Sequence, residues 1–244
     1  MSGGHQCRQL RFRLAIMKFG IIIFPGTWSD VDCYYAVHTI SGQKADYIWH
    51  KETDLSSYSC IILPGGFSYG DYLRPGAIAR FSPVMAAVTE FARKGKLVIG
   101  ICNGFQMLCE SGLLPGVLRQ NNHLQYRCQW THIRVENNSL SFTAKCQAGQ
   151  VLKIPVSHYE GCYYADDATL DELETENRIA FRYTTPDGIE NTNTNPNGSL
   201  HNIAGIVNKQ RNVLGMMPHP ERSCEAILGS TDGNIIWESI VASI

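Results

Sequence analysis

A cysteine flanked by two glycines is the feature of this chain best suited to chemistry. Cys102 follows an apolar run, with Gly100 two residues before it and Gly104 two residues after it. This spacing is the cysteine counterpart of the G-x-S-x-G nucleophile elbow, in which a strand turns sharply into a helix and presents a reactive side chain. The pattern predicts a thiol that can attack a substrate carbonyl. The alternative is one more buried cysteine, a residue type common in protein cores.

The backbone near this thiol is expected to stabilise a tetrahedral intermediate. The N–H group of Asn103, directly after the cysteine, would point at the oxygen of that intermediate, and the start of the following helix favours thiolate. Gly66 follows a second apolar run and offers another N–H group, with no Cβ to block approach. The alternative for Gly66 is a plain glycine turn.

A cysteine nucleophile needs a group that takes its proton and later protonates the leaving group, and histidine suits this task near neutral pH. Among eight histidines, His219 stands out because Pro218 and Pro220 fix its backbone after an apolar strand. Glu221 lies two residues further on, where an extended segment places both side chains on the same side. We expect Glu221 to orient the imidazole. The alternative is an ordinary loop histidine.

The composition restricts the classes of partner. Of the 244 residues, 44% are hydrophobic and 18% charged, and the formal net charge is -1, which argues against nucleic acid as a partner. Nine scattered cysteines without a C-x-x-C pair argue against a disulfide framework and a zinc site and favour a reducing cytoplasm. The apolar runs are shorter than the roughly 20 residues that a membrane span requires. A soluble, cytoplasmic protein without a metal is expected.

The first sixteen residues are interpreted separately from the rest. They carry three arginines and no acidic residue, yet they lack a secretory apolar region and a cleavage site. We interpret residues 1–16 as an N-terminal extension, either non-native or from an alternative start, because Met17 directly precedes the first clean strand. Residues 17–244 then form a single domain.

Strands alternate with helices through the first half of this domain. The predicted strands are Phe19–Phe24, Ala45–Trp49, Cys60–Leu63 and the run that ends at Cys102. One predicted helix begins with Asp30 as its cap, and a second spans Pro83–Lys94 and is ended by Gly95. This order implies an α/β fold with a doubly wound, mostly parallel sheet. The active crevice of such a sheet lies at the carboxyl ends of its strands, where Gly66 and Cys102 stand.

The second half is expected to extend this sheet with antiparallel strands. Short strands separated by polar turns are predicted from Tyr126 to Ile154, and Asn191–Asn197 is a turn-rich loop. Ile203–Val207 and Val213–Met217 form a predicted hairpin whose second strand leads to His219. The glycine-rich segment 64–74 lacks the Lys-Ser/Thr ending of a phosphate-binding loop, which disfavours nucleotide binding there.

Three motifs together resemble the class I (triad) glutamine amidotransferases. They are P-G-G-F-S-Y-G-D-Y-L-R at 64–74, G-I-C-N-G-F-Q at 100–106 and P-H-P-E-R at 218–222, and the similarity runs from about Met17 to the C-terminus. Asn103 and the long F-S-Y-G-D-Y-L-R segment resemble the purine-pathway members, the glutaminase subunits of phosphoribosylformylglycinamidine synthase. The resemblance implies a single flavodoxin-like domain.

The resemblance also implies roles for individual residues. Cys102 would be the nucleophile, His219 the acid/base and Glu221 its orienting partner, with the oxyanion hole supplied by Gly66 and Asn103. Residues matching the glutamine pocket are Gly65, Gln106, Trp130 and Thr131. The sequence departs from the family in the Gly26–Asp30 loop, where relatives often have Asn-Cys, and at Tyr159, where glycine is common.

By the same resemblance, the enzyme hydrolyses glutamine to glutamate and ammonia through a thioester. The chain has no Walker motif, so the ammonia is expected to react on another polypeptide. The implied partners are a large synthetase subunit, PurL, and a small bridging subunit, PurS. PurL would bind ATP and magnesium and convert formylglycinamide ribonucleotide to formylglycinamidine ribonucleotide in purine (IMP) biosynthesis. No cofactor is expected in this chain itself. The rival interpretations are a stand-alone cysteine hydrolase or peptidase and an inactive binding module.

Overall fold

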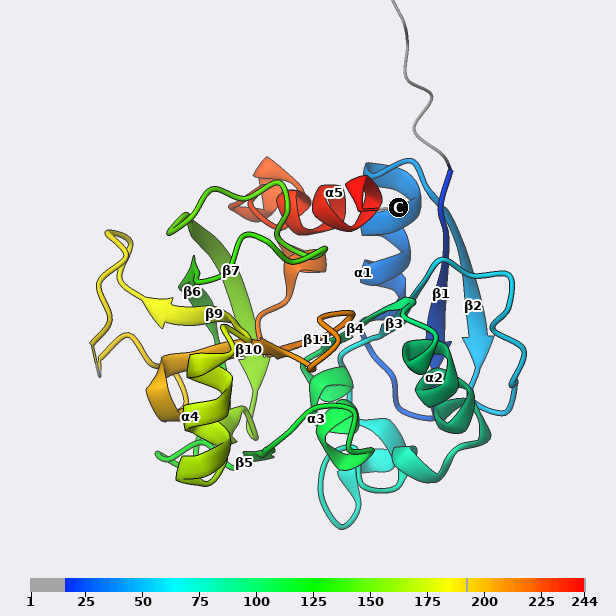
Figure 1. Cartoon of the computed structure of the whole chain (residues 1–244), viewed down its shortest axis with the longest axis horizontal. Coiled ribbons are helices and arrows are strands. Elements are labelled where there is room, and N and C mark those ends of the chain that lie inside the picture. Colours follow the sequence, from blue (N-terminus) through cyan, green and yellow to red (C-terminus); the bar gives the residue numbers. More distant parts are fainter. Residues whose placement is uncertain (1–15, 192, 244) are drawn as a thin grey trace, which may run out of the picture.

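A nine-stranded mixed sheet forms the centre of the computed structural model, which describes residues 16–191 and 193–243. The strand order is β2-β1-β3-β4-β11-β10-β9-β6-β7 (Figure 1). The parallel strands are β1 (Lys18–Ile23), β2 (Lys44–Trp49), β3 (Cys60–Leu63), β4 (Leu97–Ile101) and β11 (Val213–Met216). The antiparallel extension consists of β10 (Ile203–Val207), β9 (Ile179–Thr184), β6 (Arg127–Val135) and β7 (Val151–His158). The expected α/β fold is confirmed.

Sequence pattern and burial agree most closely in the central strands. Every residue of β3, β4 and β11 is buried, as expected of parallel strands that helices cover on both faces. The predicted bounds of Cys60–Leu63 match β3, and the predicted hairpin is the antiparallel pair β10–β11. The proposed N-terminal extension, residues 1–16, lies outside the described residues except for Ile16.

Helices cover both faces of the sheet. One face carries α1 (Asp30–Tyr34), which continues as a π-helical segment (Tyr35–Ile40), and α5 (Asn234–Ala242) beside it (Figure 1). The other face carries α2 (Pro83–Arg93), α3 (Asn103–Glu110) and α4 (Asp167–Thr175). Short 3-10 turns span Ser68–Asp71, Ala79–Phe81, Leu200–Asn202, Pro220–Arg222 and Ala226–Leu228.

One helix start differs from the prediction. Asp30 is the first residue of α1, whereas Ser29 occupies the cap position and makes no capping hydrogen bond. The Ser29 hydroxyl instead accepts a hydrogen bond from Arg222 Nη2 at 2.7 Å. The predicted end of α2 is confirmed, because Gly95 follows it in a left-handed conformation with φ of 78°.

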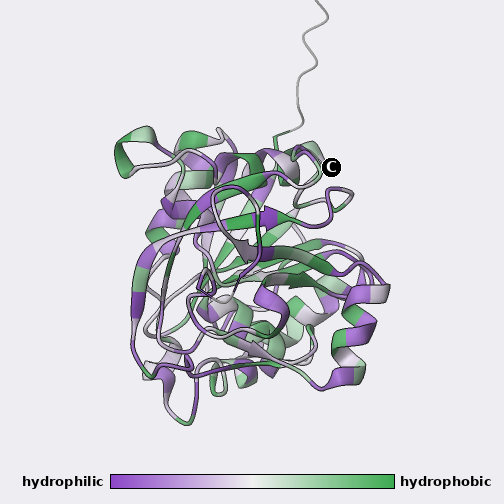
Figure 2. Cartoon of the chain, turned by 90° about the vertical axis from the view of Figure 1, so that its left-hand side faces the viewer, coloured by the Kyte–Doolittle hydropathy of each residue, from purple (hydrophilic) through white to green (hydrophobic). Residues whose placement is uncertain are grey.

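Hydrophobic residues gather on the strands, and hydrophilic residues on the outer loops and helix faces (Figure 2). A second, two-stranded sheet pairs β5 (Val117–Arg119) with β8 (Cys162–Tyr164), and each of its strands is too short to give a sequence pattern. Within the described ranges, no helix has the length and apolar character needed to cross a membrane. The carboxyl ends of β3, β4 and β11 lie at one edge of the large sheet, which places three loops together.

Candidate active site

The predicted elbow is present at the junction of β4 and α3. Cys102 directly follows β4 and has φ of 52° and ψ of -104°, a conformation that residues with a side chain rarely adopt. Such a backbone costs on the order of 1–3 kcal/mol and persists only where its surroundings impose it. The strain turns the chain from the strand into the helix within one residue and leaves the thiol beside the edge of the sheet.

The two glycines around Cys102 are required by the close contact between α3 and the sheet. A Cβ on Gly104 would lie 1.9 Å from the carbonyl oxygen of Leu63, at the end of β3. A Cβ on Gly100 would lie 2.6 Å from the carbonyl oxygen of Gly104. Both distances are far below van der Waals contact, so the G-x-C-x-G spacing reflects the packing of the helix against β3 and β4.

The loop after β11 brings His219 and Glu221 together. The backbone N–H of His219 donates a hydrogen bond to the Pro155 carbonyl at 2.8 Å, and His219 Nδ1 lies 2.5 Å from Glu221 Oε1. The contact forms through the 3-10 turn Pro220–Arg222 rather than through the extended segment expected from the sequence. Both side chains are buried, so Glu221 fixes the orientation of the ring away from bulk water.

His219 lies close to Cys102 across the Gly65 backbone. A Cβ placed on Gly65 would be 2.8 Å from His219 Cε1 and 3.5 Å from Cys102 Cβ. Burial alone would lower the pKa of His219, but the charge of Glu221, the hydrogen bond to Glu221 and the proximity of Cys102 outweigh it and raise that pKa to about 10. The geometry thus favours a protonated imidazole between a carboxylate and a thiol.

Two backbone N–H groups beside the thiol are free to bind an anionic oxygen. Within residues 16–191 and 193–243, neither Gly66 nor Asn103 donates a backbone hydrogen bond, Asn103 being the first residue of α3. Gly66 has φ of 150°, and a Cβ there would lie 2.6 Å from the Trp28 backbone nitrogen. Free donors at the ends of two adjacent strands are the arrangement expected of an oxyanion hole.

Cys102 lines two narrow cavities, of about 80 and 60 Å³. Both are lined by Gly66, Phe67 and Ser157. The first also contains His219, Ser29, Trp28, Tyr126 and Arg222, and the second contains Gln106, Asp71, Pro75, His158, Tyr159 and Glu160. Both departures from the family pattern, the Trp28 loop and Tyr159, therefore lie at the walls of these cavities.

Of the four residues expected to bind glutamine, Gln106 lines a cavity at the thiol, and Gly65 lies between Cys102 and His219. The structure does not bring Trp130 and Thr131 to either cavity. Thr131 is buried in β6 and donates to the Ile154 carbonyl, while Trp130 packs under Lys153. Their role in binding remains a prediction, and the segment 157–160 occupies the cavity wall instead.

Sequence reasoning missed several polar groups around the thiol. Ser157 accepts a hydrogen bond from Cys102 Sγ through its carbonyl oxygen at 3.6 Å. Arg222 donates to Ser29 at 2.7 Å and to Asp32 at 3.1 Å, and it ties the His219 loop to α1. Arg222 could have been found from its place in the P-H-P-E-R motif, whereas Ser157 acts through its backbone and gives no sequence signal.

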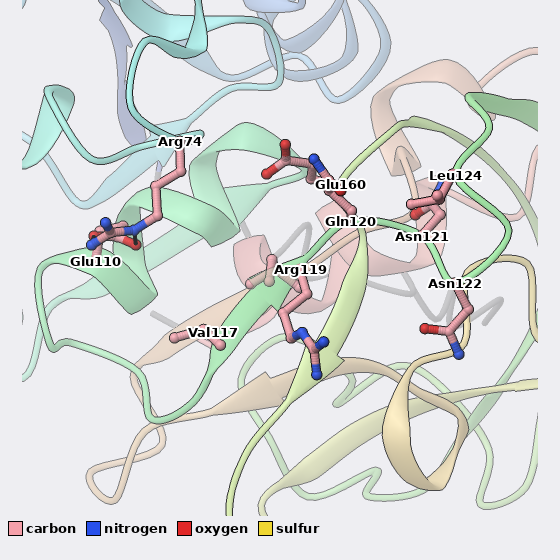
Figure 3. A pocket seen from close by; sticks show the side chains of 10 residues that line it. Arg74, Glu110, Val117, Arg119, Gln120, Asn121, Asn122, Leu124 and Glu160 are labelled. Carbon is pink, nitrogen blue, oxygen red and sulfur yellow. Dashed lines mark hydrogen bonds and ion pairs between the residues drawn. The ribbon is translucent and has the colours of Figure 1, made fainter.

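A much larger cleft, of about 590 Å³, lies beside this site. Figure 3 shows Arg74 reaching toward Glu110, with Arg119, Asn121 and Asn122 further along the wall. Its lining contains no cysteine or histidine, and it shares Glu160 with the smaller cavity beside Cys102. Chemistry rather than size therefore identifies the candidate active site.

Comparison with known families agrees with this geometry. The model of the CobB/CobQ-like glutamine amidotransferase domain matches residues 17–237. The chain therefore belongs to this family of glutamine amidotransferases.

More similar relatives narrow the assignment. The phosphoribosylformylglycinamidine synthase subunit PurQ of Moorella thermoacetica is 59% identical over 225 residues, covering 92% of this chain and 95% of the relative. The PurQ subunit of Aquifex aeolicus is 49% identical over 226 residues, covering 93% of this chain and all of that one (100%). Within the amidotransferases, the chain belongs to the PurQ family.

One solved structure agrees with this assignment, and a second shares the fold. A chain in the structure of PurLQS from Thermotoga maritima has a TM-score of 0.82 and 38% identity, covering 93% of this chain and 98% of that one. A putative GMP synthase subunit from Thermoplasma acidophilum has a TM-score of 0.61 at 13% identity, with 93% and 94% covered, and this match shows the shared fold.

Proposed function

We propose that this chain releases ammonia from glutamine through a thioester on Cys102, as the glutaminase subunit of phosphoribosylformylglycinamidine synthase. One observation carries the assignment of residues: the elbow thiol, the His219–Glu221 pair and two free N–H donors meet at the same sheet edge. Each group supplies one requirement of acyl transfer to a cysteine.

The first half of the reaction forms the thioester. The Cys102 thiolate attacks the side-chain amide carbon of glutamine, and the N–H groups of Gly66 and Asn103 bind the resulting oxyanion. His219 gives its proton to the amide nitrogen, the carbon–nitrogen bond breaks, and ammonia leaves. The ion pair with Glu221 keeps the imidazole in position for this transfer.

The second half regenerates the thiol. Neutral His219 takes a proton from water, and the hydroxide equivalent attacks the thioester carbonyl. The carbon–sulfur bond breaks, which releases glutamate and the Cys102 thiolate beside protonated His219. The narrowness of both cavities at the thiol favours a small amide over a polypeptide, and this argues against a peptidase.

The ammonia serves a reaction on another subunit. A relative of this chain occurs in a solved PurLQS structure, which supports PurL and PurS as partners. In this proposal, PurL binds ATP and magnesium, activates the amide oxygen of formylglycinamide ribonucleotide and uses the ammonia to make formylglycinamidine ribonucleotide in purine (IMP) biosynthesis. Ammonia released into water would be protonated and lost, so we expect a sealed path between the two subunits. The cytoplasm, where purine nucleotides are made and thiols stay reduced, is the proposed location.

The experiment reconstitutes the complex and changes the nitrogen donor. Cys102→Ala is expected to abolish synthesis of formylglycinamidine ribonucleotide from glutamine while leaving synthesis from ammonium chloride intact. Cys128→Ala, which changes an exposed cysteine on β6, is the matched control and should retain both activities. Glutamine-dependent synthesis by Cys102→Ala would overturn the proposed mechanism.

A further inference from the structure

The side chain of Asn103, as distinct from its backbone, is enclosed in a polar network that the mechanism above does not use. Only 1% of the residue is exposed. Its Oδ1 accepts a hydrogen bond from the Ser68 backbone N–H at 3.1 Å, and its Nδ2 donates to Gln106 Oε1 at 2.9 Å and to Asp71 Oδ1 at 3.3 Å. One carboxamide therefore joins the start of α3 to the 66–71 loop.

The polarity of the partners fixes the orientation of this carboxamide. The Ser68 N–H can only donate, so it requires an acceptor, which is Asn103 Oδ1. The Asp71 carboxylate requires a donor, which is Nδ2. A flipped amide would set two donors against each other and an oxygen against the carboxylate. No other uncharged side chain of this length offers both groups at these positions.

The network spans the two groups proposed to bind the oxyanion. One donor is the N–H group of Gly66, which lies two residues before Ser68 in the loop that the Asn103 side chain binds. The other donor is the backbone N–H group of Asn103 itself. The backbone near Ser68 is irregular, because Tyr69, Gly70 and Asp71 all have positive φ. The N–H groups of Phe67 and Tyr69 bind the carbonyls of Gly26 and Pro25 on one side of this loop, and the N–H group of Ser68 binds Asn103 on the other. The carboxamide supplies a direct link between the two donors.

The same network reaches the wall of the smaller cavity at the thiol. The side-chain amide of Gln106 accepts a hydrogen bond from Asn103 and donates one, through Nε2, to the Glu160 carbonyl oxygen at 2.6 Å. Gln106, Asp71 and Glu160 all line the cavity of about 60 Å³. Asn103 is thereby connected to both walls of the space beside the thiol.

We propose that the Asn103 side chain is a positioning group that sets the separation of the Gly66 and Asn103 N–H donors and so determines the strength of the oxyanion hole. This inference rests on the proposed glutaminase function. The side chain of the residue after the nucleophile then has a role of its own, in addition to that of the backbone N–H group.

Asn103→Asp tests the inference because aspartate has the shape of asparagine but carries an oxygen acceptor in place of the Nδ2 donor. The new carboxylate would place an oxygen against Asp71 and Gln106, which separates the loops while the Asn103 backbone N–H remains. The matched control is Asn212→Asp, since Asn212 is also a buried asparagine, and its Nδ2 donates to two carbonyls, those of Ala92 and Lys96. Both variants are assayed in the reconstituted complex with PurL and PurS.

Three readouts separate positioning from general damage. Because one oxyanion donor contributes about 100-fold or more to kcat, Asn103→Asp is expected to lower kcat for glutamine by about 100-fold, with a smaller effect on KM. Inhibition by glutamate γ-semialdehyde, whose thiohemiacetal oxygen needs the same donors, should weaken by a similar factor. Alkylation of Cys102 by iodoacetamide, which needs the thiol but no oxyanion hole, should keep its rate.

Each outcome supports or overturns the inference. A normal kcat in Asn103→Asp overturns it, as does an equal fall in kcat in Asn212→Asp. A kcat loss with unchanged semialdehyde inhibition, or with slowed alkylation, also contradicts it because the defect would then lie outside the oxyanion hole. Failure of the wild-type complex to use glutamine would instead overturn the proposed function, so the two failures are distinguishable.

Discussion

The backbone N–H of Cys102 donates a hydrogen bond to the Met216 carbonyl at 2.8 Å. This bond joins the elbow to the last residue of β11, three residues before His219. The thiol and the imidazole, 117 positions apart in the sequence (219 minus 102), are therefore held by adjacent parallel strands. The order of the strands in the sheet therefore brings the thiol to the start of the loop that carries His219.

The strained backbone at Cys102 predicts an unusual order of stability. Because φ is positive there, Cys102→Gly should be more stable than Cys102→Ala by about 1 kcal/mol, as glycine adopts this conformation without strain. Urea unfolding of the two variants measures the difference. Cys60, buried in β3, is the control, and there the alanine variant should be the more stable by about 0.5–1 kcal/mol. The same order at both positions would contradict strain at the elbow.

Glu221→Gln should separate binding of glutamine from its chemistry. The amide keeps the shape of the side chain but cannot stabilise a charged imidazole, so kcat in the complex should fall by about 100-fold or more. KM for glutamine should change little, because Glu221 lies behind His219 and lines neither cavity at the thiol. Steady-state kinetics at saturating ATP test this, and a change confined to KM would contradict the assigned role.

The His219–Glu221 pair also predicts how stability depends on pH. The pKa of His219 is raised above its unfolded value, so the pair stabilises the fold fully below about pH 6.5 and loses this effect as pH rises through about 10. Removing the carboxylate should cost about 3 kcal/mol at pH 6.5. The gap in free energy of unfolding between wild type and Glu221→Gln should narrow toward pH 10. A gap that stays constant from pH 6.5 to pH 10 would show that His219 is neutral in the folded protein.

Isolation from the synthetase should limit turnover. We expect the isolated chain to release glutamate slowly, with a rise of about fivefold or more when PurL, PurS, ATP and formylglycinamide ribonucleotide are added, a typical size for coupling between sites. Glutamate release measures the effect, and Cys102→Ala gives the background. Full glutamine turnover by the chain alone, unaffected by the partners, would remove the coupling from this account.

Short sequence patterns were sufficient to predict those parts of the fold and the site that depend on residues close together in the chain. The β3 bounds follow from four consecutive apolar residues, and the elbow follows from glycines that the contact between Gly104 and Leu63 makes necessary. His219 and Glu221 were found because prolines and spacing mark their loop. All of these signals lie within a few positions along the chain.

The remaining features depend on the assembled fold. The Ser157 carbonyl contacts Cys102 through a backbone atom, which leaves no trace in residue type. Trp130 and Thr131 were matched by resemblance, and their role in binding stays a prediction, because they stand opposite Pro155 and Ile154 in the β6–β7 pair and line neither cavity at the thiol. The short β5–β8 sheet carries three residues in each strand, too few for a periodic pattern.

The central claim, attack on glutamine by Cys102, is tested most directly by covalent trapping. The diazoketone analogue 6-diazo-5-oxo-norleucine is incubated with the complex, and the modified residue is located by peptide mass spectrometry. We expect one adduct, on Cys102, and none on the other eight cysteines. An adduct on a different residue, formed with loss of glutamine-dependent synthesis while Cys102 stays unmodified, would contradict it.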